Sequence, residues 1–150
     1  MARQNENIRA TLRNSSVFAS DRTIVGGRRD ERKVGDAVLV VEDEVLVRMA
    51  IAEELRDAGY TVIEVSTAHE ALELLRYNNV DVRLIFSDVL MPGTMDGVVL
   101  ARTVRSEFPV IKIMLTSANL TRLDWAKHDG FFPKPYDAVQ IIKHIKKLLD

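Results

Sequence analysis

The sequence contains no cysteine, which excludes disulfide bridges and thiolate metal sites and fits a reducing compartment. No apolar run approaches the roughly 18–20 residues needed to cross a bilayer, and the N-terminus lacks the apolar core of a secretory signal. A net charge of −1 gives no reason to expect a nucleic-acid partner. We therefore expect a cytoplasmic protein that binds neither membrane nor nucleic acid.

The 150 residues, 47% of them hydrophobic and 29% charged, suffice for one globular domain with a substantial core. The charge is unevenly distributed, because residues 1–37 contain eight basic and five acidic side chains, whereas the remainder contains thirteen and seventeen. The first stretch also has few large apolar residues. We predict a flexible or loosely docked extension over residues 1–36, either a solvated tail or a partner-binding arm.

From Ala37 onward, strand-like and helix-like patterns alternate. Short aliphatic, β-branched and aromatic runs predict five strands, over residues 38–41, 61–65, 82–87, 111–115 and 131–133. Helices of this length between strands imply right-handed crossovers and a parallel sheet. We therefore predict an α/β fold of the flavodoxin-like, doubly wound (βα)5 type, a five-stranded parallel sheet with helices on both faces.

Local signals mark several helices between these strands. Gly59 is a candidate cap for the end of the first helix, and Thr67 begins a capping box that Glu70 completes. Apolar side chains at three- and four-residue steps predict the inner faces of the first and last helices. These stripes are Val45, Met49, Ala52, Leu55 and Ala58 in the first helix, and Val139, Ile142, Ile145 and Leu149 in the last.

Four of the predicted strands end in polar residues. Glu42 and Asp43 follow the first, Asp88 the third, Thr116 and Ser117 the fourth, and Lys134 the fifth. In an open parallel sheet, ligands bind beyond the carboxyl ends of the strands. Crowded carboxylates repel one another, which favours a bound cation, and a site with only oxygen ligands favours Mg²⁺. A carboxylate held there can attack a phosphoryl group while a lysine neutralises a phosphate oxygen.

These motifs, together with the segment from Ser87 to Gly97, closely resemble the receiver domain of bacterial two-component response regulators, with residues 37–150 as that domain. The resemblance implies that Asp88 is the phosphoacceptor and that Lys134 binds the phosphoryl group. It also implies a Mg²⁺ site, with Mn²⁺ as a possible substitute, and a cis bond before Pro135. The implied metal ligands are Glu42 through water, Asp43, Asp88 and the backbone carbonyl of Leu90.

The resemblance assigns further roles around this site. Ser117, which precedes a small residue, is the better match for the switch hydroxyl, and Thr116 is the alternative. Phe131 matches the switch aromatic but lacks a hydroxyl group, so it can move only as a packing element. Leu90 and Asn119 occupy positions that influence the lifetime of the phosphoryl group in receivers.

Two departures from the family pattern concern the loops. The Pro-Gly loop after Asp88 is one residue longer than usual, with Thr94 as the insertion, and the segment between Ser117 and Lys134 is several residues short. We therefore expect a stubby fourth helix and no dimerisation of the usual kind through it.

The resemblance implies a stand-alone phospho-switch rather than an enzyme. Its partner would be a histidine kinase or a histidine phosphotransfer protein, and its signal would pass by docking to an unknown downstream protein or by phosphorelay, without a DNA-binding output. One alternative is a pseudo-receiver that binds partners constitutively, although the intact acidic set argues against it. Another is a haloacid-dehalogenase-like phosphatase, which usually has a second carboxylate two residues after the nucleophile, where this chain has Leu90.

Overall fold

The structure, a computed structural model, describes residues 37–119 and 127–150. Within these ranges the chain alternates between strands and helices, and the bounds of the strands agree with the predicted ones to within two residues. The elements are β1 (Ala37–Val41), α2 (Val45–Asp57), β2 (Thr61–Val65), α3 (Ala68–Tyr77), β3 (Val82–Asp88), α4 (Gly97–Glu107), β4 (Lys112–Ser117), β5 (Gly130–Pro133) and α5 (Ala138–Leu149).

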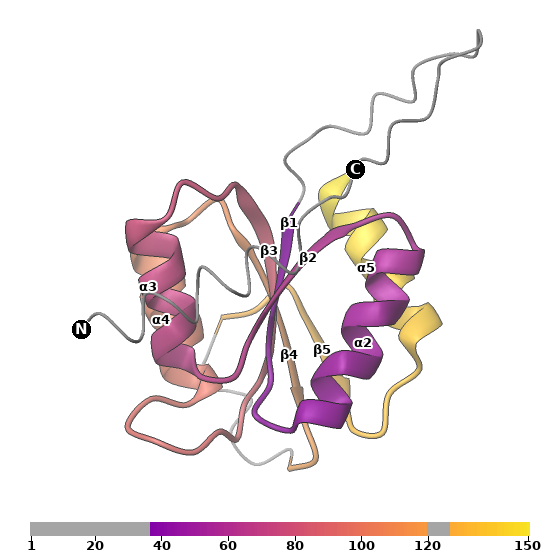
Figure 1. Ribbon diagram of the computed structural model, residues 1–150, viewed down its shortest axis with the longest axis horizontal. Coiled ribbons are helices and arrows are strands. Elements are labelled where there is room, and N and C mark those ends of the chain that lie inside the picture. The colour runs from indigo at the N-terminus through magenta and orange to yellow at the C-terminus, as the bar shows by residue number, and fades with distance from the viewer. Residues whose placement is uncertain (1–36, 120–126) are drawn as a thin grey trace, which may run out of the picture.

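The five strands form one parallel sheet in the order β2-β1-β3-β4-β5, which confirms the flavodoxin-like prediction. Helices α3 and α4 cover one face of the sheet and α2 and α5 cover the other, as Figure 1 shows. The register aligns the strand ends, because Val41 pairs with Ser87, and Asp88 pairs with Thr116. The polar residues that follow β1, β3, β4 and β5 are therefore delivered to the same edge.

Side chains alternate between the two faces of the sheet and build two hydrophobic cores. On β1, Val38 and Val40 pack in the core beneath α2 and α5, whereas Leu39 and Val41 pack in the core beneath α3 and α4. All four are fully buried. Strands buried on both faces explain why these segments are continuous aliphatic runs rather than alternating patterns.

The N-cap at Thr67 and the glycine after α2 are confirmed, whereas Glu70 Oε1 accepts from the hydroxyls of Ser66 and Thr67 instead of completing the predicted capping box. The backbone N–H of Glu70 donates to Thr67 Oγ1 over 3.1 Å, and Gly59 follows α2 with a φ of 98°, in the left-handed region that glycine adopts readily. The predicted stripe of α2 is partly wrong, because Val45 and Met49 are exposed while Ile51 is buried together with Ala52 and Leu55. Ile51, Ala52 and Leu55 pack in the core beneath α2 and α5, so the buried face is confined to the middle and end of the helix.

The predicted apolar stripe of α5 is also partly wrong. Val139, in its first turn, is exposed, and the fully buried residues of α5 are Ile141 and Ile145. Two predictions concern residues outside the described ranges. They are the extension over residues 1–36 and most of the short helix expected between Ser117 and Lys134. Across the described ranges, no helix combines the length and apolar character needed to cross a membrane.

Candidate functional site

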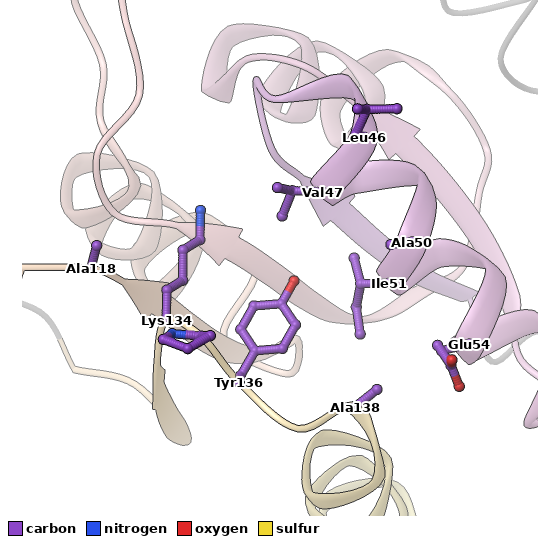
Figure 2. A pocket seen from close by; sticks show the side chains of 10 residues that line it. Leu46, Val47, Ala50, Ile51, Glu54, Ala118, Lys134, Tyr136 and Ala138 are labelled. Carbon is purple, nitrogen blue, oxygen red and sulfur yellow. The ribbon is translucent and has the colours of Figure 1, made fainter.

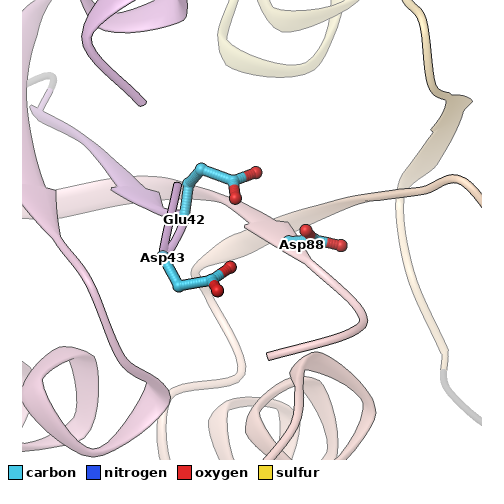
Figure 3. Close-up of side chains that lie close together, drawn as sticks. All are labelled: Glu42, Asp43 and Asp88. Atoms are coloured by element: carbon cyan, nitrogen blue, oxygen red, sulfur yellow. The ribbon is translucent and has the colours of Figure 1, made fainter. Parts of the chain in front are cut away.

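Three carboxylates converge at the carboxyl edge of the sheet. Glu42 and Asp43 follow β1, Asp88 ends the neighbouring strand β3, and one oxygen from each of the three lies within 4.8 Å of the other two. Figure 3 shows the three side chains extending into the same space beyond the strand ends. Glu42 and Asp88 are buried, and Asp43 is half-buried. We refer to Glu42, Asp43 and Asp88 as the acidic cluster.

Lys134 reaches into the acidic cluster from the end of β5. Its Nζ donates to Glu42 Oε2 over 2.8 Å and to Asp88 Oδ2 over 2.7 Å. Burial opposes the charged ammonium, but the hydrogen bonds to Asp88 and Glu42 outweigh it and raise the pKa of Lys134 well above its usual range. One fixed cation therefore bridges carboxylates from β1 and β3, and the bond between Lys134 and Pro135 is cis.

The position of Glu42 in the acidic cluster affects its pKa. Burial raises the pKa of Glu42, and the negative charge of Asp88 adds to the effect. Two hydrogen bonds lower the pKa of Glu42 but do not cancel the burial effect. One comes from Lys134, and the other comes from the backbone N–H of Glu44, which donates to Glu42 Oε1 over 3.1 Å. One ammonium against three carboxylates leaves negative charge unbalanced in the acidic cluster.

Backbone groups fix the orientation of Asp88. The N–H of Leu90 donates to Asp88 Oδ1 over 3.1 Å, and Leu90 itself is largely exposed. Gly97 begins α4 directly against this strand end, because a Cβ added to Gly97 would lie 2.1 Å from the backbone oxygen of Asp88. Only glycine allows this close approach. The inserted Thr94 in the intervening loop contacts His69 on α3, with 2.8 Å between Thr94 Oγ1 and His69 Nε2.

Both candidate switch hydroxyls are buried at the end of β4. Ser117 Oγ accepts a hydrogen bond from the backbone N–H of Asn119 over 3.0 Å, whereas Thr116 Oγ1 has no hydrogen-bond partner among the described residues. Thr116 is the ladder neighbour of Asp88, and Ser117 is one residue further along β4. Phe131 packs at the margin of the core beneath α3 and α4. The structure thus brings every predicted site residue to the carboxyl half of the sheet.

Two neighbours of the acidic cluster were not predicted from the sequence. Arg48, on α2, donates from Nη1 to the backbone oxygen of Glu42 over 2.7 Å. Tyr136 packs edge-on against Phe86, and burial, followed by the charge of Glu42, raises the pKa of its hydroxyl to about 12. A cationic side chain in the first turns of a helix is the one signal in the sequence that could have drawn attention to Arg48.

Tyr136 and Lys134 also line an apolar pocket of about 700 Å³ beside the acidic cluster. Figure 2 shows these two side chains facing Val47 and Ile51, which come from α2 on the other side of the pocket. Leu46, at the outer margin, is the most exposed large apolar side chain of α2. The charged side chains of the acidic cluster and Lys134 therefore lie beside an apolar pocket.

The residues present fit a hard divalent cation. All three ligand candidates offer carboxylate oxygens, the donor type that Mg²⁺ prefers, and the excess of negative charge favours a cation over further protonation at neutral pH. None of the three histidines belongs to this group within residues 37–119 and 127–150. The arrangement can hold a metal, and it presents the carboxylate of Asp88 next to an ammonium that can bind a phosphate oxygen.

Comparisons with known proteins agree with this geometry. The family profile described as "Response regulator receiver domain" matches residues 38–146. The sensor kinase CckA of Brucella abortus is 38% identical over 75% of this chain, and the transcriptional regulatory protein CseB of Streptomyces avermitilis is 35% identical over the same share. The alignments span 12% of CckA and 48% of CseB, so the chain matches only part of each relative.

A solved structure with a similar fold is the signal receiver domain of a signal transduction histidine kinase from Syntrophus aciditrophicus. It is 30% identical, the match covers 77% of this chain and 90% of that one, and the TM-score is 0.69. The similarity therefore extends over nearly the whole of that domain and over the described part of this chain.

Proposed function

Because the chain belongs to the response regulator receiver family, we propose that Asp88 accepts a phosphoryl group from a phosphohistidine of a histidine kinase or histidine phosphotransfer protein. The observation that supports this most directly is the buried Asp88 carboxylate, held by Leu90 N–H and Lys134 beside two further carboxylates. An oxygen of Asp88 attacks phosphorus, the O–P bond forms and the bond between phosphorus and the histidine nitrogen breaks.

The residues around Asp88 divide the remaining tasks. Glu42 through water, Asp43, Asp88 and the carbonyl of Leu90 would hold Mg²⁺ or Mn²⁺, which would neutralise charge on the phosphoryl oxygens. Lys134 transfers its hydrogen bond from the Asp88 carboxylate to a phosphoryl oxygen. Ser117 exchanges its contact with the N–H of Asn119 for a bond to another phosphoryl oxygen, which couples the phosphoryl group to β4.

We further propose that the signal leaves this domain by docking to another protein or by onward phosphoryl transfer, without catalysis on any other substrate. The similarity to receivers that belong to histidine kinases supports this part of the proposal. Phosphorylation then acts by population shift between two arrangements of the β4 and β5 ends.

The test is phosphorylation by phosphoramidate with Mg²⁺, followed by intact-mass measurement. We expect the protein to gain one acid-labile phosphoryl group and Asp88→Asn to gain none. Asp96→Asn is the matched control, because Asp96 lies in the adjacent loop and an asparagine can still accept the N–H of Val99. Full labelling of Asp88→Asn would refute the assignment, whereas repeated turnover of a small phosphate ester would indicate a phosphatase instead.

A further inference from the structure

Arg48 connects the acidic cluster to the outer strand of the sheet through a chain of polar contacts. Beyond its bond to the backbone oxygen of Glu42, its Nε lies 3.7 Å from Glu64 Oε1 on β2. The other oxygen of Glu64 accepts from Arg56 Nη2 over 2.8 Å. Arg48 and Glu64 are both mostly buried, so their contact is shielded from solvent more than a surface ion pair is.

The bond to Glu42 completes the anchoring of the peptide that precedes Asp43. The N–H of Glu42 donates to the backbone oxygen of Val65 over 3.2 Å, and its carbonyl accepts from Arg48. The backbone between β1 and α2 is thus held on one side by β2 and on the other by a guanidinium. Because the side chains of Glu42 and Asp43 leave from this backbone, its orientation determines where their carboxylates point.

A contribution to the stability of α2 does not explain why an arginine occupies position 48. It is the fourth residue of the helix, near the end where the helix dipole is positive and a cation is unfavourable. No acidic residue occupies the first turn, and the N-cap residue Glu44 makes no side-chain capping bond. The favourable contacts of Arg48 are therefore those to Glu42 and Glu64.

We propose that Arg48, oriented by Glu64, is a positioning residue that fixes Glu42 and Asp43 for binding a divalent cation. The proposal rests on the proposed function, since it concerns the same acidic cluster. Two effects of Arg48 oppose each other, because its contacts orient the ligands while its positive charge repels a cation. Glu64, which Arg56 also contacts, offsets only part of that charge, but the hydrogen bond from Arg48 to the Glu42 carbonyl is short, so we expect orientation to dominate. Loss of a residue that orients metal ligands typically weakens metal binding by about 10–100-fold.

The experiment is a titration of the unphosphorylated full chain with MgCl₂, followed by two-dimensional amide NMR. Arg48→Met should bind Mg²⁺ about tenfold more weakly than the unchanged protein. Arg48→Lys keeps the charge and one donor, and should lose about threefold. Arg76→Met, which removes an arginine from an exposed ion pair with Glu107, is the matched control and should bind Mg²⁺ within twofold of the unchanged protein.

The outcomes separate the possible roles of Arg48. If Arg48 acted only as a repelling charge, Arg48→Met would bind Mg²⁺ more tightly, and that result or an unchanged affinity would overturn the proposal. If Arg48→Met does not fold, Arg48→Lys decides in the same way, since unchanged affinity in that variant contradicts a positioning role. Absence of Mg²⁺ binding by the unchanged protein would instead contradict the proposed function.

Discussion

Two carboxylates at opposite edges of the sheet are each held by a cation, yet their pKa values move in opposite directions. Glu42, at the carboxyl edge, is bonded to Lys134, and burial with the nearby charge of Asp88 raises its pKa. Asp129, just before β5 at the amino edge, also experiences burial. There, however, the bonds from Ile113 N–H and Arg105 outweigh burial and lower the pKa of Asp129.

The difference lies in the number of negative charges that each cation must balance. Arg105 donates to Asp129 Oδ2 over 3.0 Å, Ile113 N–H donates to the same oxygen over 2.8 Å, and His144 donates to the Asp129 carbonyl over 2.8 Å. Among the described residues, no other carboxylate shifts the pKa of Asp129, whereas Lys134 is shared between Glu42 and Asp88. The Asp129 contacts therefore stabilise the fold, and the acidic cluster retains negative charge that can bind a ligand.

The largest expected effect on stability follows from removing the Asp129 carboxylate, whose Oδ2 accepts two hydrogen bonds. Asp129→Ala should lower the free energy of unfolding by about 2 kcal/mol, because it leaves the buried N–H of Ile113 and the Arg105 guanidinium without their acceptor. Asp129→Asn can still accept from Ile113 and should cost about half as much. Urea denaturation measures both, and an alanine variant as stable as the unchanged protein would remove the contrast between the two edges.

A smaller effect of opposite sign is expected at the acidic cluster. Glu42→Gln should raise the free energy of unfolding by about 1 kcal/mol at pH 7 in EDTA, because it removes a buried charge that the fold destabilises. The folded-state pKa of Glu42 lies above its ordinary value of 4.5, so the folded protein binds the proton more tightly than the unfolded chain does. Stability therefore increases as the pH falls through the folded-state pKa towards 4.5.

The advantage of Glu42→Gln should accordingly shrink as the pH falls through the raised folded-state pKa, and it should be lost below the ordinary value of 4.5, where Glu42 is protonated in both states. Saturating Mg²⁺ should also reverse the order of stability, because the cation stabilises the protein that binds it more tightly. Thermal melting in EDTA and in MgCl₂ across this pH range provides the measurement. A glutamine variant less stable than the unchanged protein under every condition would show that the Lys134 bond outweighs the cost of burial.

Most of the fold and the acidic cluster could be predicted because both depend on local patterns. Continuous aliphatic runs identified the strands, and a parallel sheet brings their carboxyl ends together whatever the details of packing. Asp88 and Lys134, 46 residues apart, could therefore be assigned to the same edge of the sheet, where the structure shows them in contact.

Contacts that depend on helix rotation could not be predicted. The stripe assigned to α2 included Val45 and Met49, which are exposed, and the same error in rotation concealed that Arg48 points back to the carbonyl of Glu42. The contacts of Asp129 join β4, α4 and α5 through single residues far apart in the sequence. No periodicity or motif marks such residues.

The smallest expected effect tests whether Asp129 stabilises the fold because its contacts are buried or simply because it is paired with a cation. Arg76 on α3 and Glu107 on α4 form a short ion pair, and the hydrogen bond from Arg76 lowers the pKa of Glu107. Both side chains are well exposed, so water and salt screen the attraction, and ordering two long side chains offsets much of what remains. We expect Arg76→Met to leave the melting temperature unchanged within error at physiological ionic strength, in contrast to Asp129→Ala. A loss of stability as large as that of Asp129→Ala would mean that pairing itself, rather than burial of the paired groups, distinguishes Asp129 from Glu42.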